Sequence, residues 1–182
     1  SYSYATAVGY KAGYSLTTTG VTAFGFEAAR SSTTGGGVHI GYQAGYSQTT
    51  GNQNVSVGDN ALYSNQTNQY NVAIGKSALY SLAGSSLDGN VAVGWEAGRN
   101  AQCDTSTIMI GYRSGYRQKG HSSISIGYEA ARYAEGGQLV AIGRNAGDAL
   151  TTGVGRNVAI GVSAMSAITT NTQNVAIGPN AL

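Results

Sequence analysis

The sequence predicts an all-β fold, a parallel β-roll or solenoid made of short stacked coils. One glycine recurs every 16 to 19 residues, an apolar residue always precedes it, and Ala follows three positions later in ten of eleven units. The repeat glycines are Gly9, Gly25, Gly41, Gly58, Gly75, Gly94, Gly111, Gly127, Gly143, Gly161 and Gly178. A unit of this length is too short for a strand, a helix and two turns, and it is typical of one coil of a solenoid.

The segment before each repeat glycine is expected to form the strand of the coil. The position directly before each repeat glycine is apolar and usually β-branched, as at Ile74. The third position before glycine is always β-branched, as at Val72, and a residue that is usually small, such as Ala73, lies between the two. This period of two indicates a strand of about five residues. We expect the Val and Ile side chains to point inward and to form the core.

The repeat glycine is expected to begin a turn. Glycine permits a positive φ, or a close backbone approach where a Cβ would clash with the next coil. Segments 46–53 and 63–70 are rich in Ser, Thr, Asn, Gln and Gly and are predicted loops. Asn opens the strand in five units, and stacked Asn side chains can form a ladder. These residues are Asn54, Asn71, Asn90, Asn157 and Asn174.

Composition limits the classes of partner. Residues 1–182 are predicted to be a single repeat domain, a fragment of a longer polypeptide because the last repeat is incomplete. The net charge of +2 is too small for a nucleic-acid-binding surface. No apolar run approaches the roughly 20 residues that cross a membrane. We therefore expect neither nucleic acid binding nor membrane insertion.

The repeated phrase resembles known fibrous proteins. "NVAIGKSALY" at 71–80 and "NVAVGWEAGR" at 90–99 are similar to the head repeat of trimeric autotransporter adhesins, a YadA-like left-handed parallel β-roll. "LYSNQTNQYNVAIG" at 62–75 is also similar to repeats of phage tail fibres. The resemblance implies a left-handed homotrimer around one axis, with a role in host attachment. The long period and the many Tyr residues favour a virion tail fibre over an adhesin head on a bacterial surface.

The small column between the apolar positions is the predicted seam between chains of the trimer. Its assigned members are Ala7, Ala23, His39, Ala73, Ala92, Met109, Ala141, Ala159 and Ala176. The alternative is that these side chains pack against their own chain. Three copies of His39 at a trimer axis could hold a metal or an anion, but a larger residue tolerated beside a small void is the simpler interpretation.

No catalytic residue, metal or cofactor is predicted. The two histidines, His39 and His121, are far apart in the sequence, and no close pair of carboxylates can be argued. Aromatic residues recur one and five positions after glycine. The candidate receptor-binding residues, for a host glycan or protein, are Trp95, Arg99, Tyr112, Tyr116 and Tyr128. The alternative is that these rings only cover the turns.

Two further sequence features suggest possible ligands. The basic stretch 111–121, with Arg113, Arg117 and Lys119, could meet an acidic glycan or lipopolysaccharide, or could be a solvated face. Pairs of Thr suggest an ice-binding solenoid as a further alternative, although they fall in loops of varying length, whereas an ice-binding face needs a regular array. The pairs are 18–19, 33–34, 49–50, 151–152 and 169–170.

Overall fold

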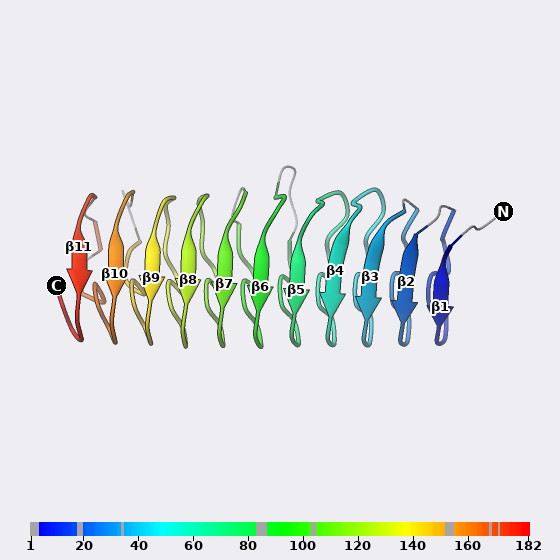
Figure 1. The fold of residues 1–182 in the computed structure, drawn as a ribbon, viewed down its shortest axis with the longest axis horizontal. Helices are drawn as coiled ribbons and strands as arrows, with labels where there is room; N and C mark the ends of the chain where they lie inside the picture. Colours follow the sequence, from blue (N-terminus) through cyan, green and yellow to red (C-terminus); the bar gives the residue numbers. More distant parts are fainter. Residues whose placement is uncertain are drawn as a thin grey trace.

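The computed structural model of the chain describes residues 4–17, 20–33, 35–82, 87–102, 105–151, 155–167, 169–170 and 172–182. Eleven short parallel strands follow one another along a single long body, and the two termini lie at its opposite ends (Figure 1). The strands are β1 (Thr6–Val8), β2 (Val21–Phe24), β3 (Gly37–Ile40), β4 (Asn54–Val57), β5 (Val72–Ile74), β6 (Val91–Val93), β7 (Ile108–Ile110), β8 (Ile124–Ile126), β9 (Val140–Ile142), β10 (Val158–Ile160) and β11 (Val175–Ile177).

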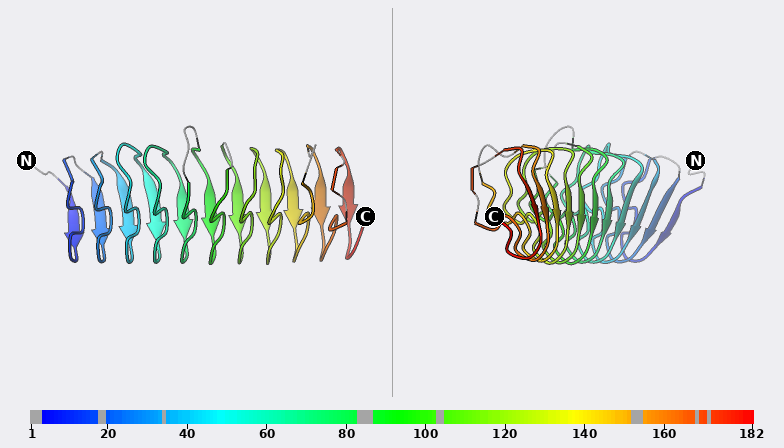
Figure 2. Two further views of the ribbon diagram at one scale, coloured as in Figure 1. Left: turned by 180° about the vertical axis from the view of Figure 1, so that it is seen from behind. Right: turned by 60° about the vertical axis from the view of Figure 1, so that its left-hand side comes forward.

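The strands form one parallel sheet in chain order, so each repeat is one coil of an all-β solenoid. Equivalent residues of neighbouring repeats are paired; Ala73, for example, lies opposite Ala92. The described residues contain no helix. Figure 2 shows the sheet on one side of a flattened tube and the returning segments on the other. The predicted all-β parallel solenoid is confirmed, although the strands have three or four residues rather than about five.

The repeat glycines begin the turns for both of the predicted reasons. Their φ values lie between 122° and 138°, a region that side-chain-bearing residues rarely adopt. A Cβ on Gly75 would lie 2.5 Å from the carbonyl oxygen of Gly94 in the next coil. The same contact with the following glycine recurs along the stack, as at Gly143, where the distance to the Gly161 oxygen would be 2.4 Å. Stacking at this spacing therefore requires glycine.

The two faces of the strand are oriented opposite to our expectation. In β2, Val21 and Ala23 are buried, whereas Thr22 and Phe24 are exposed. The column that contains Ala points into the roll along its whole length, and the columns of Val and Ile form the outer surface of the sheet. The prediction that Val and Ile make the core is wrong.

The reason is the narrow interior. The turn lies directly beneath the strand: a Cβ on Gly147 would be in van der Waals contact, at 3.4 Å, with the Cβ of Ala141. The small strand column thus fits the short distance between strand and turn. The interior is filled instead by Ala from the strand, by the Ala three after glycine, and by a few larger side chains from the turn and return segments. The larger ones include Leu62, Leu79, Leu82, Leu150 and Met165.

Larger residues enter the inward strand column where glycine lies opposite. His39 packs against Gly45, because a Cβ there would be 2.4 Å from His39 Nδ1. Met109 likewise packs against Gly98 and Gly115, where an added Cβ would be 2.8 Å and 2.7 Å from its sulfur. A gain in volume on the strand is thus matched by a loss in the turn, in keeping with dense packing of protein interiors.

The predicted Asn ladder is present at the start of the strands. Asn54 Oδ1 accepts a hydrogen bond from the backbone N–H of Asn71 at 2.9 Å, and Asn71 Oδ1 accepts one from Asn90 at 2.9 Å. Asn157 and Asn174 repeat the arrangement. The left-handed conformation falls on the residue before Asn rather than on Asn itself. Each Asn therefore holds the next coil through a side chain-to-backbone bond.

Candidate functional site

The small column assigned to the trimer seam is enclosed by its own chain. From Ala23 to Ala176 its members are at most 2% exposed, and only Ala7, in the first coil, is exposed. The buried members of the predicted set are Ala23, His39, Ala73, Ala92, Met109, Ala141, Ala159 and Ala176. These side chains leave no surface for a second chain, so the placement of the seam is corrected. In the structure these side chains pack against their own chain, as the alternative interpretation stated.

His39 lies inside the third coil, not at an axis between chains. Its Nδ1 is 2.8 Å from Ser56 Oγ, and burial lowers the pKa of its imidazole from 6.5 to about 4. The ring is therefore neutral near pH 7. A set of three His39 imidazoles around a metal or an anion is excluded by this position. His39 is instead a larger residue accommodated inside the roll, where Gly45 lies opposite and leaves space for the ring.

The outer sheet face carries apolar side chains. We define it as the residues one and three positions before each repeat glycine. Phe24, Ile74 and Ile177 on this face are 56%, 40% and 68% exposed. Because equivalent positions pair in register, these side chains run in two unbroken columns over eleven strands. Contiguous apolar surface of this kind is typical of a contact with another macromolecule.

The aromatic columns are stacks of rings at the spacing of the coils. The centroids of Tyr46, Tyr63 and Tyr80 are 5.0 Å and 5.1 Å apart, with planes within 6° of parallel. Tyr10 and Phe26 stack in the same way at 5.1 Å. The Tyr63 ring therefore lies between the rings of Tyr46 and Tyr80, which cover both of its faces. This supports the interpretation that most rings cover the turns.

The five predicted receptor-binding residues lie together on three neighbouring coils. Trp95 contacts Tyr112 edge-to-face at 5.2 Å, and the centroids of Tyr112 and Tyr128 are 5.0 Å apart. Arg99 donates a hydrogen bond to the Tyr116 hydroxyl at 3.1 Å. Trp95 and Tyr128 are about half exposed. The residues therefore form one patch, and receptor binding by this patch stays a prediction.

Three arginines are held by carboxylates of the same turn. The pairs are Arg30 with Glu27 at 3.3 Å, Arg99 with Glu96 at 3.7 Å, and Arg132 with Glu129 at 2.8 Å. Arg113, from the basic stretch, also contacts Glu96 at 2.6 Å. Each of these carboxylates is therefore already engaged by an arginine of its own turn. The sequence carries the signal, because Glu and Arg recur three residues apart in the same three units.

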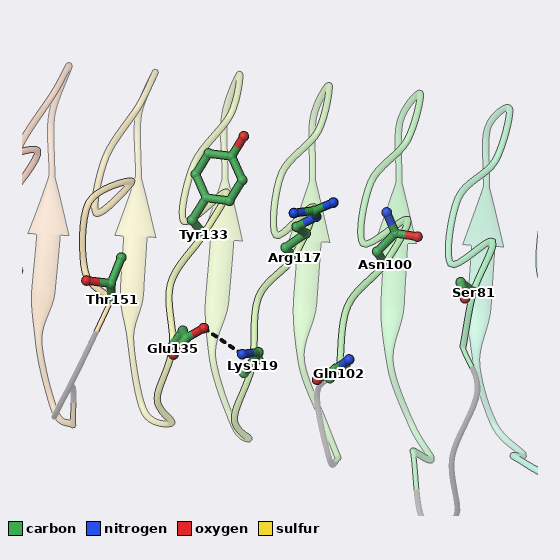
Figure 3. Close-up of a pocket in the computed structure, with 8 residues that line it drawn as sticks. All are labelled: Ser81, Asn100, Gln102, Arg117, Lys119, Tyr133, Glu135 and Thr151. Atoms are coloured by element: carbon green, nitrogen blue, oxygen red, sulfur yellow. Dashed lines mark hydrogen bonds and ion pairs between the residues drawn. The ribbon is translucent and has the colours of Figure 1, made fainter.

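A polar groove of about 770 Å³ crosses the return segments opposite the sheet. We call it the return groove (Figure 3). One side carries Ser81, Asn100, Arg117 and Tyr133, which lie six residues after the repeat glycines. The other side carries Gln102, Lys119, Glu135 and Thr151, eight residues after them. The residues between, such as Gln118 and Ala134, are fully buried.

The return groove is built by hydrogen bonds between coils. The backbone N–H of Lys119 donates to the Ala134 carbonyl at 2.8 Å, and that of Arg117 donates to the Arg132 carbonyl at 2.8 Å. Lys119 also pairs in parallel with Gln102 and with Glu135. These short extended segments alternate outward and inward side chains, as strands do. Backbone hydrogen bonds thus hold these groove segments to the next coil.

Comparisons of the chain with family models, curated proteins and solved structures gave no match. In the described segments no three His, Cys, Asp or Glu residues cluster as metal ligands would. Within the same segments, no helix has the length and apolar character of a membrane span.

Sequence reasoning found only part of the return groove. Arg117 and Lys119 belong to the predicted basic stretch and line the groove, whereas Arg113 lies on the aromatic side with Glu96. His121 is exposed. A usable signal was present: most coils carry Ser, Thr or Ala at these two positions, and Asn, Gln, Arg, Lys, Tyr and Glu replace them in three consecutive coils.

Proposed function

We propose that the chain is a segment of a homotrimeric phage tail fibre that provides reach and attaches to the host surface, without catalysis. The observation that carries the proposal is the outer sheet face, an apolar surface of stacked Val and Ile from β3 to β11. Such a surface is costly to expose to water and is typical of an interface. The repeat phrase, with its resemblance to trimeric fibre and adhesin repeats, supports the stoichiometry.

The seam of the proposed trimer is the outer sheet face instead of the Ala column. Its side chains project from a sheet with every strand in register, so three identical faces can pack along one axis. Hydrogen bonds between coils run along the same direction over all eleven strands, roughly 50 Å at strand spacing. A rod with this bonding resists extension, as a fibre must.

Light scattering tests the assembly. We expect a mass of three times 18.5 kDa. Ile74→Lys and Ile110→Lys should give monomers with an unchanged circular dichroism spectrum, because charge is inserted into the buried seam. Val162→Lys is the matched control, since Val162 is 42% exposed but lies in the turn after Gly161. A monomeric parent protein, or trimers of both Ile variants, would refute the proposed seam.

The attachment role is tested on host cells. Labelled protein should bind the cell surface, and Trp95→Ala should weaken binding while the protein stays folded. Phe26→Ala provides the control, because Phe26 occupies the same column and is similarly exposed at 42% but lies far along the roll from Trp95. Equal binding by the parent protein and the Trp95 variant would show that the attachment site does not include Trp95.

Two alternatives have their own outcomes. A membrane anchor following this segment in the full gene would favour the bacterial adhesin head.

The ice-binding solenoid is the other alternative. The hydroxyls of Thr17 and Thr33 already donate hydrogen bonds to carbonyls of the next coil, at 2.8 Å and 2.9 Å, so these donor protons are not available to ice. Residues 18–19, 34 and 152 of the Thr pairs lie outside the described residues. We expect no thermal hysteresis; clear hysteresis would favour ice binding.

A further inference from the structure

The return groove has the features of a binding site for an extended ligand. It crosses five consecutive coils, from Ser81 to Thr151, which corresponds to about 19 Å at strand spacing. Each side carries a polar side chain on four consecutive coils. A periodic array of this kind fits a linear polymer lying parallel to the long axis better than a compact molecule.

We propose that the return groove binds a linear acidic polysaccharide through Arg117 and Lys119. The inference deepens the proposed attachment function and rests on it for its biological meaning. Arg117 and Lys119 are two residues apart on one extended segment, about 6.6 Å along the backbone, and lie on opposite sides of the groove. Carboxylates of the polymer would accept hydrogen bonds from these two cations.

Arg117 is the better-placed cation for this role. Among the described residues no carboxylate contacts it, whereas Arg99, Arg113 and Arg132 each contact a glutamate. Its exposed guanidinium carries five donors in a planar fork that matches a carboxylate. Lys119 already contacts Glu135 at 2.6 Å, so an incoming carboxylate competes with Glu135 for the ammonium group.

The remaining groups of the groove suit sugar rings. Asn100 and Gln102 on one coil provide amide donors and acceptors for hydroxyls. Tyr133 is 37% exposed, and the Arg132 guanidinium lies over its ring at 4.5 Å from the centroid. The guanidinium occupies one face of the ring, and the other face can pack against the C–H face of a sugar.

Other polymers fit less well. A polynucleotide would need many phosphate contacts, and the groove has two cations beside the carboxylate of Glu135. A peptide that extends a sheet would need free backbone groups. The N–H groups of Arg117, Lys119 and Glu135 already donate to the next coil.

Binding is measured with immobilised polygalacturonate, polysialic acid and hyaluronate. The controls are methyl-esterified polygalacturonate, which has the same backbone without charge, and single-stranded poly(dT). We expect binding to at least one acidic polymer, weakened by salt, and polygalacturonate to bind at least tenfold more tightly than its ester if it is the ligand. R117Q/K119Q should lose roughly tenfold or more in affinity with unchanged thermal unfolding.

The double variant K76Q/R144Q is the matched control. Lys76 and Arg144 are exposed, each directly follows a repeat glycine, and their replacement removes the same charge. It should bind like the parent protein. E135Q should bind the acidic polymer several-fold more tightly, because Lys119 loses its competitor. The opposite results each overturn the inference: equal losses in both double variants, weaker binding by E135Q, a preference for poly(dT), or no binding to the three acidic polymers.

Failure of this inference is separable from failure of the proposed function. A trimer that attaches to cells but ignores all acidic polymers refutes the groove alone. A monomer that binds them through Arg117 and Lys119 refutes the trimeric fibre and leaves the groove assigned.

Discussion

His39 and Ser56, at paired positions of β3 and β4, are joined by a 2.8 Å hydrogen bond inside the roll. Both side chains are fully buried. The other ring nitrogen, Nε2, is buried without a hydrogen-bond partner among the described residues. Protonation would place a charge where no solvent reaches it, which explains why the pKa is lowered to about 4.

Acid should weaken the fold through His39. The folded-state pKa of about 4 lies below the ordinary 6.5, so the unfolded chain binds the proton more readily between these values. The contribution of neutral His39 to the free energy of unfolding is fully present above pH 6.5 and is lost as the pH falls toward 4. At pH 5 the free energy of unfolding should be lower by about 2 kcal/mol. Denaturant unfolding at pH 7 and pH 5 measures this difference.

The control for that measurement is His39→Met. Met109 already occupies the same column opposite a glycine, so a methionine fits the site without a titrating group. This variant should lose most of the difference between pH 7 and pH 5. An unchanged difference would assign the acid sensitivity to other groups.

Gly75→Ala should unfold or strongly destabilise the roll, by several kcal/mol, because its Cβ would lie 2.5 Å from a carbonyl oxygen. Gly178→Ala separates this clash from backbone strain. Gly178 has nearly the same φ, 122°, but no atom within 4 Å of an added Cβ, so its replacement should cost only about 1–3 kcal/mol. Similar losses of unfolding free energy in the two variants would show that the close approach of coils is unimportant.

Asn71→Ala should cost about 1–3 kcal/mol, because the buried N–H of Asn90 would lose its acceptor. The comparison is Asn174→Ala in the last coil. No described residue donates to the side-chain oxygen of Asn174, and that residue is partly exposed, so the loss should be smaller. Thermal and denaturant unfolding measure the loss of unfolding free energy in each variant. Equal losses would mean that the ladder contributes no specific stability.

The Tyr63 phenol should ionise at higher pH than an ordinary tyrosine. Burial raises its pKa above 10, and the neighbouring Tyr46 and Tyr80 add to the shift. Tyr63→Phe keeps the stacked ring and removes the hydroxyl. The difference between the ultraviolet pH titrations of the two proteins should therefore have a midpoint above 10. Because ionisation is harder in the fold, this group contributes stability that is lost as pH rises above 10. A midpoint at or below 10 would contradict the environment described for the ring.

Periodicity predicted the coil, the glycine turn and the Asn ladder, because each depends on contacts that repeat with every unit. It did not predict which strand face is inside. A period of two separates the Ala73 face from the Val72 and Ile74 face, but both are apolar. Choosing between them requires the distance between the strand and the returning chain, which depends on how each coil closes in three dimensions.

The groove could be predicted only in part, for the opposite reason. Arg117 and Lys119 depart from the repeat, so alignment of the units reveals them, but their position relative to Tyr133 and Glu135 depends on how the return segments stack. The Glu96–Arg99 contact has a signal in the sequence, since Arg follows Glu by three positions in each of the three turns.

The uniform register of the sheet also makes the repeat an interchangeable module. Removing one whole unit would join two strands that already match, as Val72 matches Val91. His39 and Gly45 fall within the same unit, so duplication by recombination would copy the bulky residue together with the gap that accommodates it. Contour length can therefore evolve in steps of about 4.8 Å while the cross-section stays the same.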